Sequence, residues 1–398
     1  MRKLISIKKE IIIILSFFLL CEFIFINNRL SILNYIRKIH KLQNKAQIKV
    51  SNFTELLFNF TINNNTILIF EPNAYHFECT PGFTKYFIDL RYNVDILMHK
   101  FGIDTFNLFD GTENIRLLVF DNLDNIHTHS KSLSFVIKKY SLIIIQTADI
   151  NDKDIFNKLD LLNINNSFFI FHNLEETENP IYSKYFDQNR IWTLGNFSKG
   201  LQVNPHYFGN IKIKDKNKKT RFFMTSSIYR NYRTLISSVE KLKKRNYNFE
   251  IFITGWNKSI KLNQIPNNLK DVFQIKYKVS YNELYQLVKS CDYIIIPFDT
   301  SKNFTLRYRT TKSTGSIQLS YGFLKPSIID EKYSYVYNLN EKNSLLYENY
   351  SYLYNAMEKA ILLGNEDYKI LESNLYITTK QIFEYSLNNI RKSINSFY

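Results

Sequence analysis

The chain has 398 residues, long enough for two domains with full cores, and its 45% hydrophobic content excludes an intrinsically disordered protein. Its 52 basic residues outnumber the 36 acidic ones, and the net charge of +16 favours anionic partners such as phosphorylated substrates, lipid headgroups or nucleic acid. Three cysteines far apart in the sequence exclude a disulfide framework and a CxxC metal pair, which fits a reducing compartment.

An apolar run near the N-terminus, residues 11–26, is flanked by basic residues on both sides. Sixteen helical residues span about 24 Å, somewhat less than the ~30 Å hydrocarbon core of a membrane. Asn27 and the residues after it offer no small-residue cleavage site, so a signal peptide is disfavoured. We therefore expect residues 1–28 to form a single membrane anchor or a shallowly inserted helix, with the globular part in the cytoplasm. The basic residues on both flanks leave the orientation of the anchor open. Residues 29–64 are expected to form a juxtamembrane helix and linker.

Short apolar runs alternate with helical patterns between residues 65 and 200. We predict strands at 66–70, 93–97, 115–120, 142–146, 167–171 and 190–194. We also predict helices over 83–90 and 133–139. Strands that alternate with helices indicate a parallel sheet. We predict a Rossmann-like domain over residues 65–200.

A loop near residue 200 and the charged run 212–221 mark the predicted boundary of a second domain, residues 201–375. Its opening elements are strands at 221–225, 249–254 and 272–277 and a helix over 232–244. The final segment, 376–398, contains a predicted helix over 378–396 with one apolar face, which we expect to pack back towards the first domain.

The stretch 276–337 holds the clearest candidate for a ligand site. It contains a helix capped by Ser280, an apolar strand over 293–298, a basic loop, and a second helix that is expected to end or bend at Gly322. The second helix opens with a run of small hydroxyl residues and glycine, and Lys312, Arg309 and Arg307 stand just upstream. Helix N-termini with unsatisfied backbone N–H groups bind phosphate, so this start is a candidate diphosphate site.

The segments CDYIIIPF, GSIQLSYG and KPSII, in this order, resemble the C-terminal half of the GT-B glycosyltransferases, and the ordered series of elements extends the resemblance from residue 66 to about 375. The resemblance implies two Rossmann-like domains that face a cleft, with the acceptor on the first and the nucleotide-sugar donor on the second, and no metal or other cofactor. Members of the retaining branch carry paired glutamates near this helix. Gln318 stands about where one would be expected, so retention and inversion both remain open.

The resemblance also suggests which residues bind the donor. Arg230 stands where related enzymes place a lysine on the diphosphate. The residues expected to bind the diphosphate are Arg230, Lys312, Ser313, Thr314, Gly315 and Ser316. Those expected in the cleft or at the nucleotide are Ser226, Ser227, Gly255, Pro297, Asp299, Arg309 and Thr311.

Candidate catalytic groups follow the strands of the first domain. His76 and Glu78 lie in the loop after the first strand, at the sheet edge where α/β proteins place their sites. Either could deprotonate an acceptor hydroxyl if the reaction inverts configuration, and local hydrogen bonding is the alternative role. His172 follows a later strand at the same edge, where it would line the cleft or be a buried core histidine.

The sequence favours a membrane-associated glycosyltransferase that moves a sugar from a nucleotide-sugar donor to a glycan or lipid-linked acceptor, in surface polysaccharide or glycolipid synthesis. The alternative is a non-catalytic, membrane-tethered binding protein with a GT-B-like shell, supported by the missing glutamates. His127 and His129 have no further ligand nearby in the sequence, so no metal site is expected. The basic residues are spread along the chain without an aromatic platform, so no nucleic-acid partner is expected.

Overall fold

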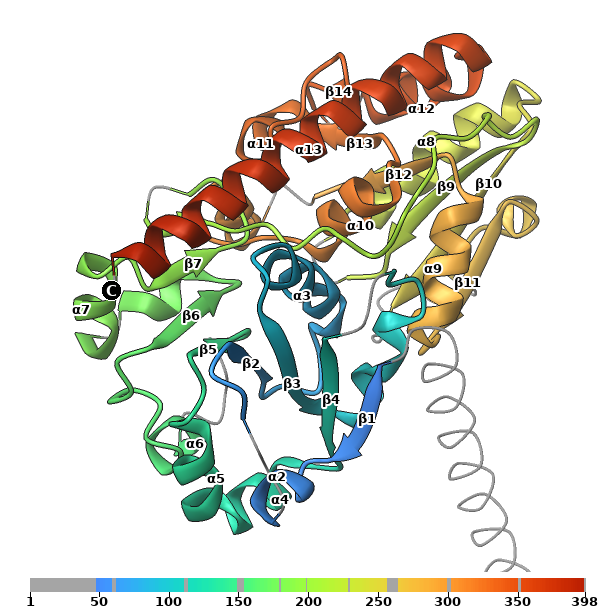
Figure 1. Cartoon of the computed structure of the whole chain (residues 1–398). Helices are drawn as coiled ribbons and strands as arrows, with labels where there is room; N and C mark the ends of the chain where they lie inside the picture. The colour runs from blue at the N-terminus through green and yellow to red at the C-terminus, as the bar shows by residue number, and fades with distance from the viewer. Residues whose placement is uncertain are drawn as a thin grey trace, which may run out of the picture.

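The computed structural model describes residues 48–58, 62–110, 114–148, 154–178, 180–197, 199–227, 230–255, 264–298, 302–349 and 352–396. Strands and helices alternate along these residues and form two parallel sheets, one in each half of the chain (Figure 1). The predicted α/β class with two sheets is therefore confirmed. The predicted anchor, residues 1–28, lies outside the described residues. No helix among the described residues is long and apolar enough to cross a membrane.

The first sheet has the strand order β1-β4-β3-β2-β5-β6-β7-β8. Its strands are β1 (Lys49–Asn52), β2 (Thr66–Glu71), β3 (Asn93–His99), β4 (Ile115–Phe120), β5 (Leu142–Ile145), β6 (Ser167–Phe171), β7 (Ile191–Thr193) and β8 (Leu201–Gln202). The accompanying helices are α2 (Glu55–Phe58), α3 (Thr80–Asp89), α4 (Leu123–Thr128), α5 (Ser130–Ile137), α6 (Asp154–Lys158) and α7 (Ser183–Asp187), with short 3-10 turns at η1 (Phe77–Cys79), η2 (Lys100–Phe106), η3 (Leu174–Glu178) and η4 (Pro180–Tyr182). The strand order reverses between β2 and β5.

The second sheet has the strand order β11-β10-β9-β12-β13-β14. Its strands are β9 (Thr220–Thr225), β10 (Phe249–Gly255), β11 (Phe273–Tyr277), β12 (Tyr293–Ile296), β13 (Ser327–Asp330) and β14 (Leu345–Tyr347). The helices are α8 (Tyr232–Lys244), α9 (Tyr281–Ser290), α10 (Gly315–Phe323), α11 (Glu331–Ser334), α12 (Leu353–Leu362) and α13 (Asn365–Asn395), with 3-10 turns at η6 (Asn267–Leu269), η7 (Asn303–Arg309) and η8 (Tyr335–Tyr337). The order reverses between β9 and β12.

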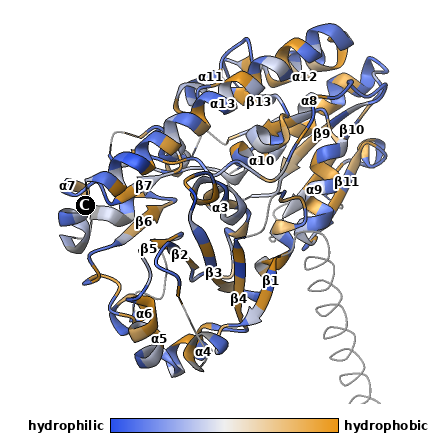
Figure 2. Cartoon of the chain, in the orientation of Figure 1, coloured by the Kyte–Doolittle hydropathy of each residue, from blue (hydrophilic) through white to orange (hydrophobic). Residues whose placement is uncertain are grey.

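Burial explains why the strands stand out in the sequence. β5, β6 and β12 are buried at every position, so they consist of nearly continuous apolar residues, as expected for parallel strands covered by helices on both faces. Figure 2 shows hydrophobic residues along β6 and β9 and hydrophilic residues along much of α13. The ligand-binding edge of such a sheet lies at the carboxyl ends of the strands, at the point where the strand order reverses.

The N-terminal limit of the first domain differs from the prediction. Within the stretch expected to be a linker, 29–64, β1 pairs in parallel with residues 116–119 of β4 and so belongs to the first sheet. Lys49-Val50-Ser51-Asn52 is short and largely polar, which is why it carries no apolar signal. The sheet also continues two residues past the predicted boundary at residue 200, through β8.

The last helix is longer than predicted. α13 begins at Asn365, well before residue 378, and its 31 residues run from the second domain to the first (Figure 1). In the second domain the Tyr368 hydroxyl donates to the Asp292 carbonyl oxygen at 3.1 Å. In the first domain the Trp192 indole N–H donates to Ser393 Oγ at 2.9 Å. α13 therefore packs on both domains and links them.

Gly322 was expected to end or bend its helix, but α10 continues through Phe323 and ends at Leu324, whose φ is 55°. A Cβ at Gly322 would lie 2.1 Å from the Phe208 ring and 2.4 Å from the His206 carbonyl oxygen. In the first domain, a Cβ at Gly82 of α3 would lie 2.3 Å from the carbonyl carbon of Pro205, in the same connecting segment. Both glycines allow the chain that joins the two domains to pass between α3 and α10.

Candidate active site

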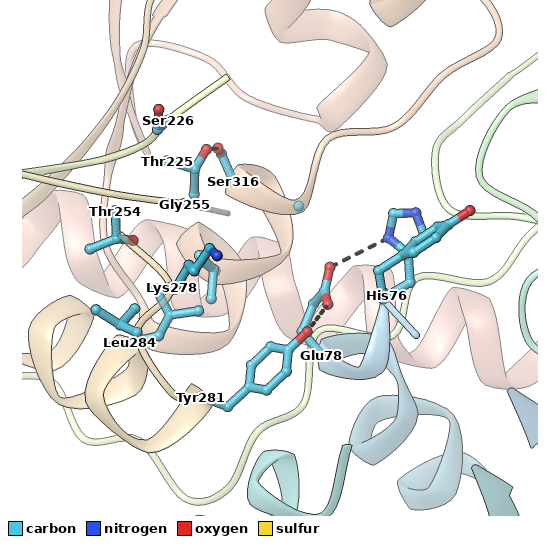
Figure 3. A pocket seen from close by; sticks show the side chains of 14 residues that line it. His76, Glu78, Thr225, Ser226, Thr254, Gly255, Lys278, Tyr281, Leu284 and Ser316 are labelled. Atoms are coloured by element: carbon cyan, nitrogen blue, oxygen red, sulfur yellow. Dashed lines mark hydrogen bonds and ion pairs between the residues drawn. The ribbon is translucent and has the colours of Figure 1, made fainter. Parts of the chain in front are cut away.

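A cavity of about 310 Å³ lies between the two domains, at the carboxyl ends of β2, β9, β10 and β11 (Figure 3). Its volume is at the small end of the ~300–1,000 Å³ typical of ligand sites. The first domain contributes Tyr75, His76 and Glu78 from the loop after β2. The second domain contributes Thr225, Ser226, Thr254, Gly255, Lys278, Val279, Tyr281, Leu284, Gly315, Ser316 and Leu319. The cavity thus lies beside the points where both strand orders reverse.

The start of α10 opens on this cavity. Thr314, the residue before the first turn, has an extended backbone, and its side chain makes no capping hydrogen bond within the described part of the chain. The Ile317 N–H donates to the Thr314 carbonyl oxygen at 3.0 Å, which leaves the backbone N–H groups of Gly315 and Ser316 for a ligand. Gly315 is exposed, and a Cβ built on it would lie 3.4 Å from Glu78 Oε1 of the opposite domain. Of the predicted diphosphate-binding residues, Gly315 and Ser316 lie on the cavity wall.

Arg230 lies directly behind that wall and is only 4% exposed. Its Nη2 donates to Ser316 Oγ at 2.9 Å, Thr225 Oγ1 at 3.2 Å and Thr314 Oγ1 at 3.3 Å. Its Nε and Nη1 have no hydrogen-bond partner among the described residues. Burial lowers the pKa of Arg230, but an arginine side chain keeps its charge in proteins. A buried positive charge therefore stands behind the hydroxyl groups at the start of α10.

Lys312 and Ser313 do not line the cavity. Lys312 forms an isolated antiparallel bridge with Asn173 of the first domain, and its Nζ lies 5.9 Å from the centre of the Tyr308 ring. The Ser313 N–H donates to the His172 carbonyl oxygen at 3.1 Å. This segment connects the two domains instead of contributing side chains to the cavity wall, which differs from the clamp predicted for Lys312.

The predicted nucleotide contacts divide in a similar way. Ser226 and Gly255 line the cavity. The other described ones support nearby loops: Ser227 N–H donates to the Tyr232 hydroxyl, and the carbonyl oxygens of Pro297, Thr311 and Arg309 accept hydrogen bonds from Asn231, Leu174 and Tyr335. Asp299 lies outside the described residues.

Glu78 is the carboxylate in the cavity wall, and it is held from both domains (Figure 3). The Tyr281 hydroxyl donates to Glu78 Oε2 at 3.1 Å, and His76 Nδ1 lies 3.6 Å from Glu78 Oε1. Burial raises the pKa of Glu78, but the contacts with His76 and Tyr281 outweigh it, and the pKa falls below its usual value. Glu78 is therefore ionised at neutral pH and able to accept a proton.

His172 does not line the cavity. It is buried, and its ring centre lies 4.1 Å from that of His76, so the two rings pack against each other. Burial lowers the pKa of His172 well below its usual value, with further contributions from His76 and Lys312, so the ring is neutral. Its observed position supports His76 from behind.

Tyr281 and Lys278 are among the cavity residues that the sequence analysis did not predict as site residues, although both follow a strand at the same edge of the second sheet. Tyr281 is the first residue of α9, and only the arrangement of the two domains brings its hydroxyl to Glu78. Lys278 follows β11 with a φ of 56° and lines the cavity. In the sequence, only their position after a predicted strand indicated that Tyr281 and Lys278 could line the cavity. Among the described residues no group of three or more His, Cys, Asp or Glu side chains is arranged to hold a metal ion.

Solved structures resemble this chain, although no protein-family model and no curated protein sequence matches it. A glycosyltransferase from Rickettsia africae ESF-5 superposes with a TM-score of 0.51 at 14% identity, over 84% of this chain and 99% of that one. HepE from Anabaena, solved in complex with UDP and glucose, superposes with a TM-score of 0.50 at 11% identity, over 83% of this chain and 99% of that one. At such low identity the similarity shows the fold, and it confirms the GT-B fold predicted from the sequence.

Proposed function

We propose that this protein is a glycosyltransferase that binds a nucleotide-sugar donor in the cavity between its two domains and transfers the sugar to an acceptor on the first domain. One observation carries the proposal: the start of α10, backed by Arg230, and the ionised carboxylate of Glu78 lie next to each other in the wall of one cavity. An anion site and a proton acceptor are thus adjacent, and displacement of a diphosphate by a hydroxyl requires both.

The donor's diphosphate belongs at the start of α10. The backbone N–H groups of Gly315 and Ser316 and the Ser316 hydroxyl would donate to the phosphate oxygens, and the helix dipole favours negative charge there. Arg230, nine-tenths buried, adds a positive charge that water screens poorly. Because the leaving diphosphate gains charge in the transition state, this preorganised environment lowers the barrier as well as binding the donor.

The acceptor is activated from the first domain. Glu78 takes the proton of an acceptor hydroxyl while that oxygen forms a bond to the anomeric carbon of the sugar. The bond from the anomeric carbon to the diphosphate oxygen breaks, and the nucleoside diphosphate leaves with the electron pair. His76 and Tyr281 keep Glu78 ionised and oriented during the transfer.

The acceptor that we propose is a glycan or a lipid-linked sugar, as in the synthesis of surface polysaccharides or glycolipids. The apolar run at residues 11–26 between basic flanks supports work at a membrane, where a lipid-linked acceptor would be held.

Titration calorimetry with a panel of nucleoside diphosphates tests donor binding. The release of nucleoside diphosphate from a panel of nucleotide sugars, in the presence of glycan and lipid-linked acceptors, tests the transfer. Gly315→Val should abolish nucleoside diphosphate binding, because the new side chain would project between α10 and Glu78. Gly364→Val is the matched control, since Gly364 also stands at a helix start and a Cβ there has nothing closer than 4.0 Å. Binding without release of diphosphate from any nucleotide sugar would favour the non-catalytic alternative.

A further inference from the structure

A fully buried carboxyl group lies behind the loop that carries His76 and Glu78. Glu71, the last residue of β2, is 0% exposed. Its Oε1 accepts from the Asn73 N–H at 2.8 Å, and its Oε2 accepts from Gln146 Nε2 at 2.8 Å and from Thr147 Oγ1 at 2.6 Å. Glu71 thereby ties the loop after β2 to the two residues that follow β5. These are the strands between which the order of the first sheet reverses.

The same network reaches His76. Gln146 Nε2, which donates to Glu71, also donates to the His76 carbonyl oxygen at 3.0 Å. His76 has a φ of 69°, in the left-handed region that is unfavourable for a residue with a Cβ. A backbone of this kind persists only when its surroundings hold it. Gln146 is itself fully buried and supplies one such restraint.

Stability alone does not explain a glutamate at this position. Burial raises the pKa of Glu71 to about 8, so at neutral pH the side chain is mainly the uncharged acid, and an apolar side chain of similar size would fill the same space without polar atoms to satisfy. Among the described residues no lysine or arginine forms an ion pair with Glu71. Its contacts lead instead to the loop that positions the proton acceptor.

We propose that Glu71 is a positioning residue for the transfer reaction. Through Gln146 it holds the His76 backbone in the conformation that directs His76 and Glu78 at the cavity. The inference rests on the proposed function, because the importance of this loop follows from the role given to Glu78.

The test combines kinetics with structure. Glu71→Gln and Gln146→Met should each lower kcat for release of diphosphate from the nucleotide sugar that the enzyme uses by at least tenfold, and leave the Kd for the corresponding nucleoside diphosphate within about threefold. In a Glu78→Gln background neither change should lower kcat much further. The position of the loop affects the rate only while Glu78 can accept a proton. Crystal structures of both variants should show His76 outside its left-handed conformation and farther from Glu78.

Glu372→Gln is the control for a general loss of stability. Glu372 is also fully buried, but it pairs with Lys325 in the second domain, so its loss should lower the melting temperature and leave kcat of the folded enzyme unchanged. Full additivity with Glu78→Gln, or an unmoved loop in both variant structures, would overturn the inference. A parent enzyme that releases diphosphate from no nucleotide sugar would instead count against the proposed function, and the variant structures would still decide whether Glu71 positions the loop.

Discussion

Replacing Arg230 by methionine should weaken nucleoside diphosphate binding without destabilising the fold. A phosphate oxygen hydrogen-bonded to Ser316 Oγ would lie about 5 Å from Arg230 Nη2, because that hydroxyl lies 2.9 Å from Nη2 and hydrogen bonds at a hydroxyl oxygen are bent. At an effective dielectric constant of about 20, a unit charge at that distance contributes about 3 kcal/mol, or roughly a hundredfold in Kd. Arg230 would thus attract the phosphate at a distance, with the Ser316 hydroxyl between them, and not through a direct hydrogen bond.

Although Arg230→Met should weaken ligand binding, it should not lower the stability of the protein. Arg230→Met removes a buried charge whose Nε and Nη1 have no partner among the described residues, so the melting temperature should stay the same or rise. Arg190→Met is the control, since Arg190 is equally buried but donates to the backbone oxygens of Ser167 and Ile164. That control should lower the melting temperature and leave Kd unchanged. If calorimetry gives the same Kd for Arg230→Met as for the parent, the charge of Arg230 has no part in donor binding.

Three further predictions address the acceptor side, pH and the membrane. Glu78→Gln should lower kcat by about 10²–10⁴ while the Kd for nucleoside diphosphate stays the same, as measured by diphosphate release and calorimetry. Burial raises the pKa of Glu71 from 4.5 to about 8 against the hydrogen bonds from Thr147 and Asn73, so the folded protein binds more protons than the unfolded chain between those values. Stability should therefore fall as the pH rises through that window, by on the order of 5 kcal/mol, and urea unfolding of Glu71→Gln at several pH values should show a smaller fall. Deleting residues 1–28 should move the protein from the membrane to the soluble fraction, and an unchanged distribution would argue against an N-terminal anchor.

Much of the fold was predictable because parallel strands buried on both faces leave continuous apolar runs. The strands at 115–120 and 167–171 and the helix at 232–244 occur as predicted. β1 was missed because an edge strand of four largely polar residues carries no such run. The early start of α13 was missed because its first turns pack on the second domain through Tyr368 and Leu371, and so lie outside the apolar face recognised from residue 378 onwards.

The site was predictable where it depends on local sequence. Gly315 and Ser316 mark a helix start, and His76 and Glu78 follow a strand, so their place at one sheet edge follows from topology. The distribution of the positive charges was not predictable. Arg230 lies behind the cavity wall, and the backbone of Lys312 bridges Asn173, because the loop after β6 packs against residues 311–313. Contacts between distant segments of this kind leave no pattern in the sequence.

A crystal structure of the protein with a bound nucleoside diphosphate tests the central claim most directly. We expect the ligand in the cavity between the two domains, with phosphate oxygens at the backbone N–H groups of Gly315 and Ser316 and the Ser316 hydroxyl between the phosphate and Arg230. Glu78 should face the vacant side of the terminal phosphate, where the sugar and the acceptor hydroxyl would meet. A nucleotide bound away from the start of α10, or with its phosphates directed away from Arg230, would contradict the account.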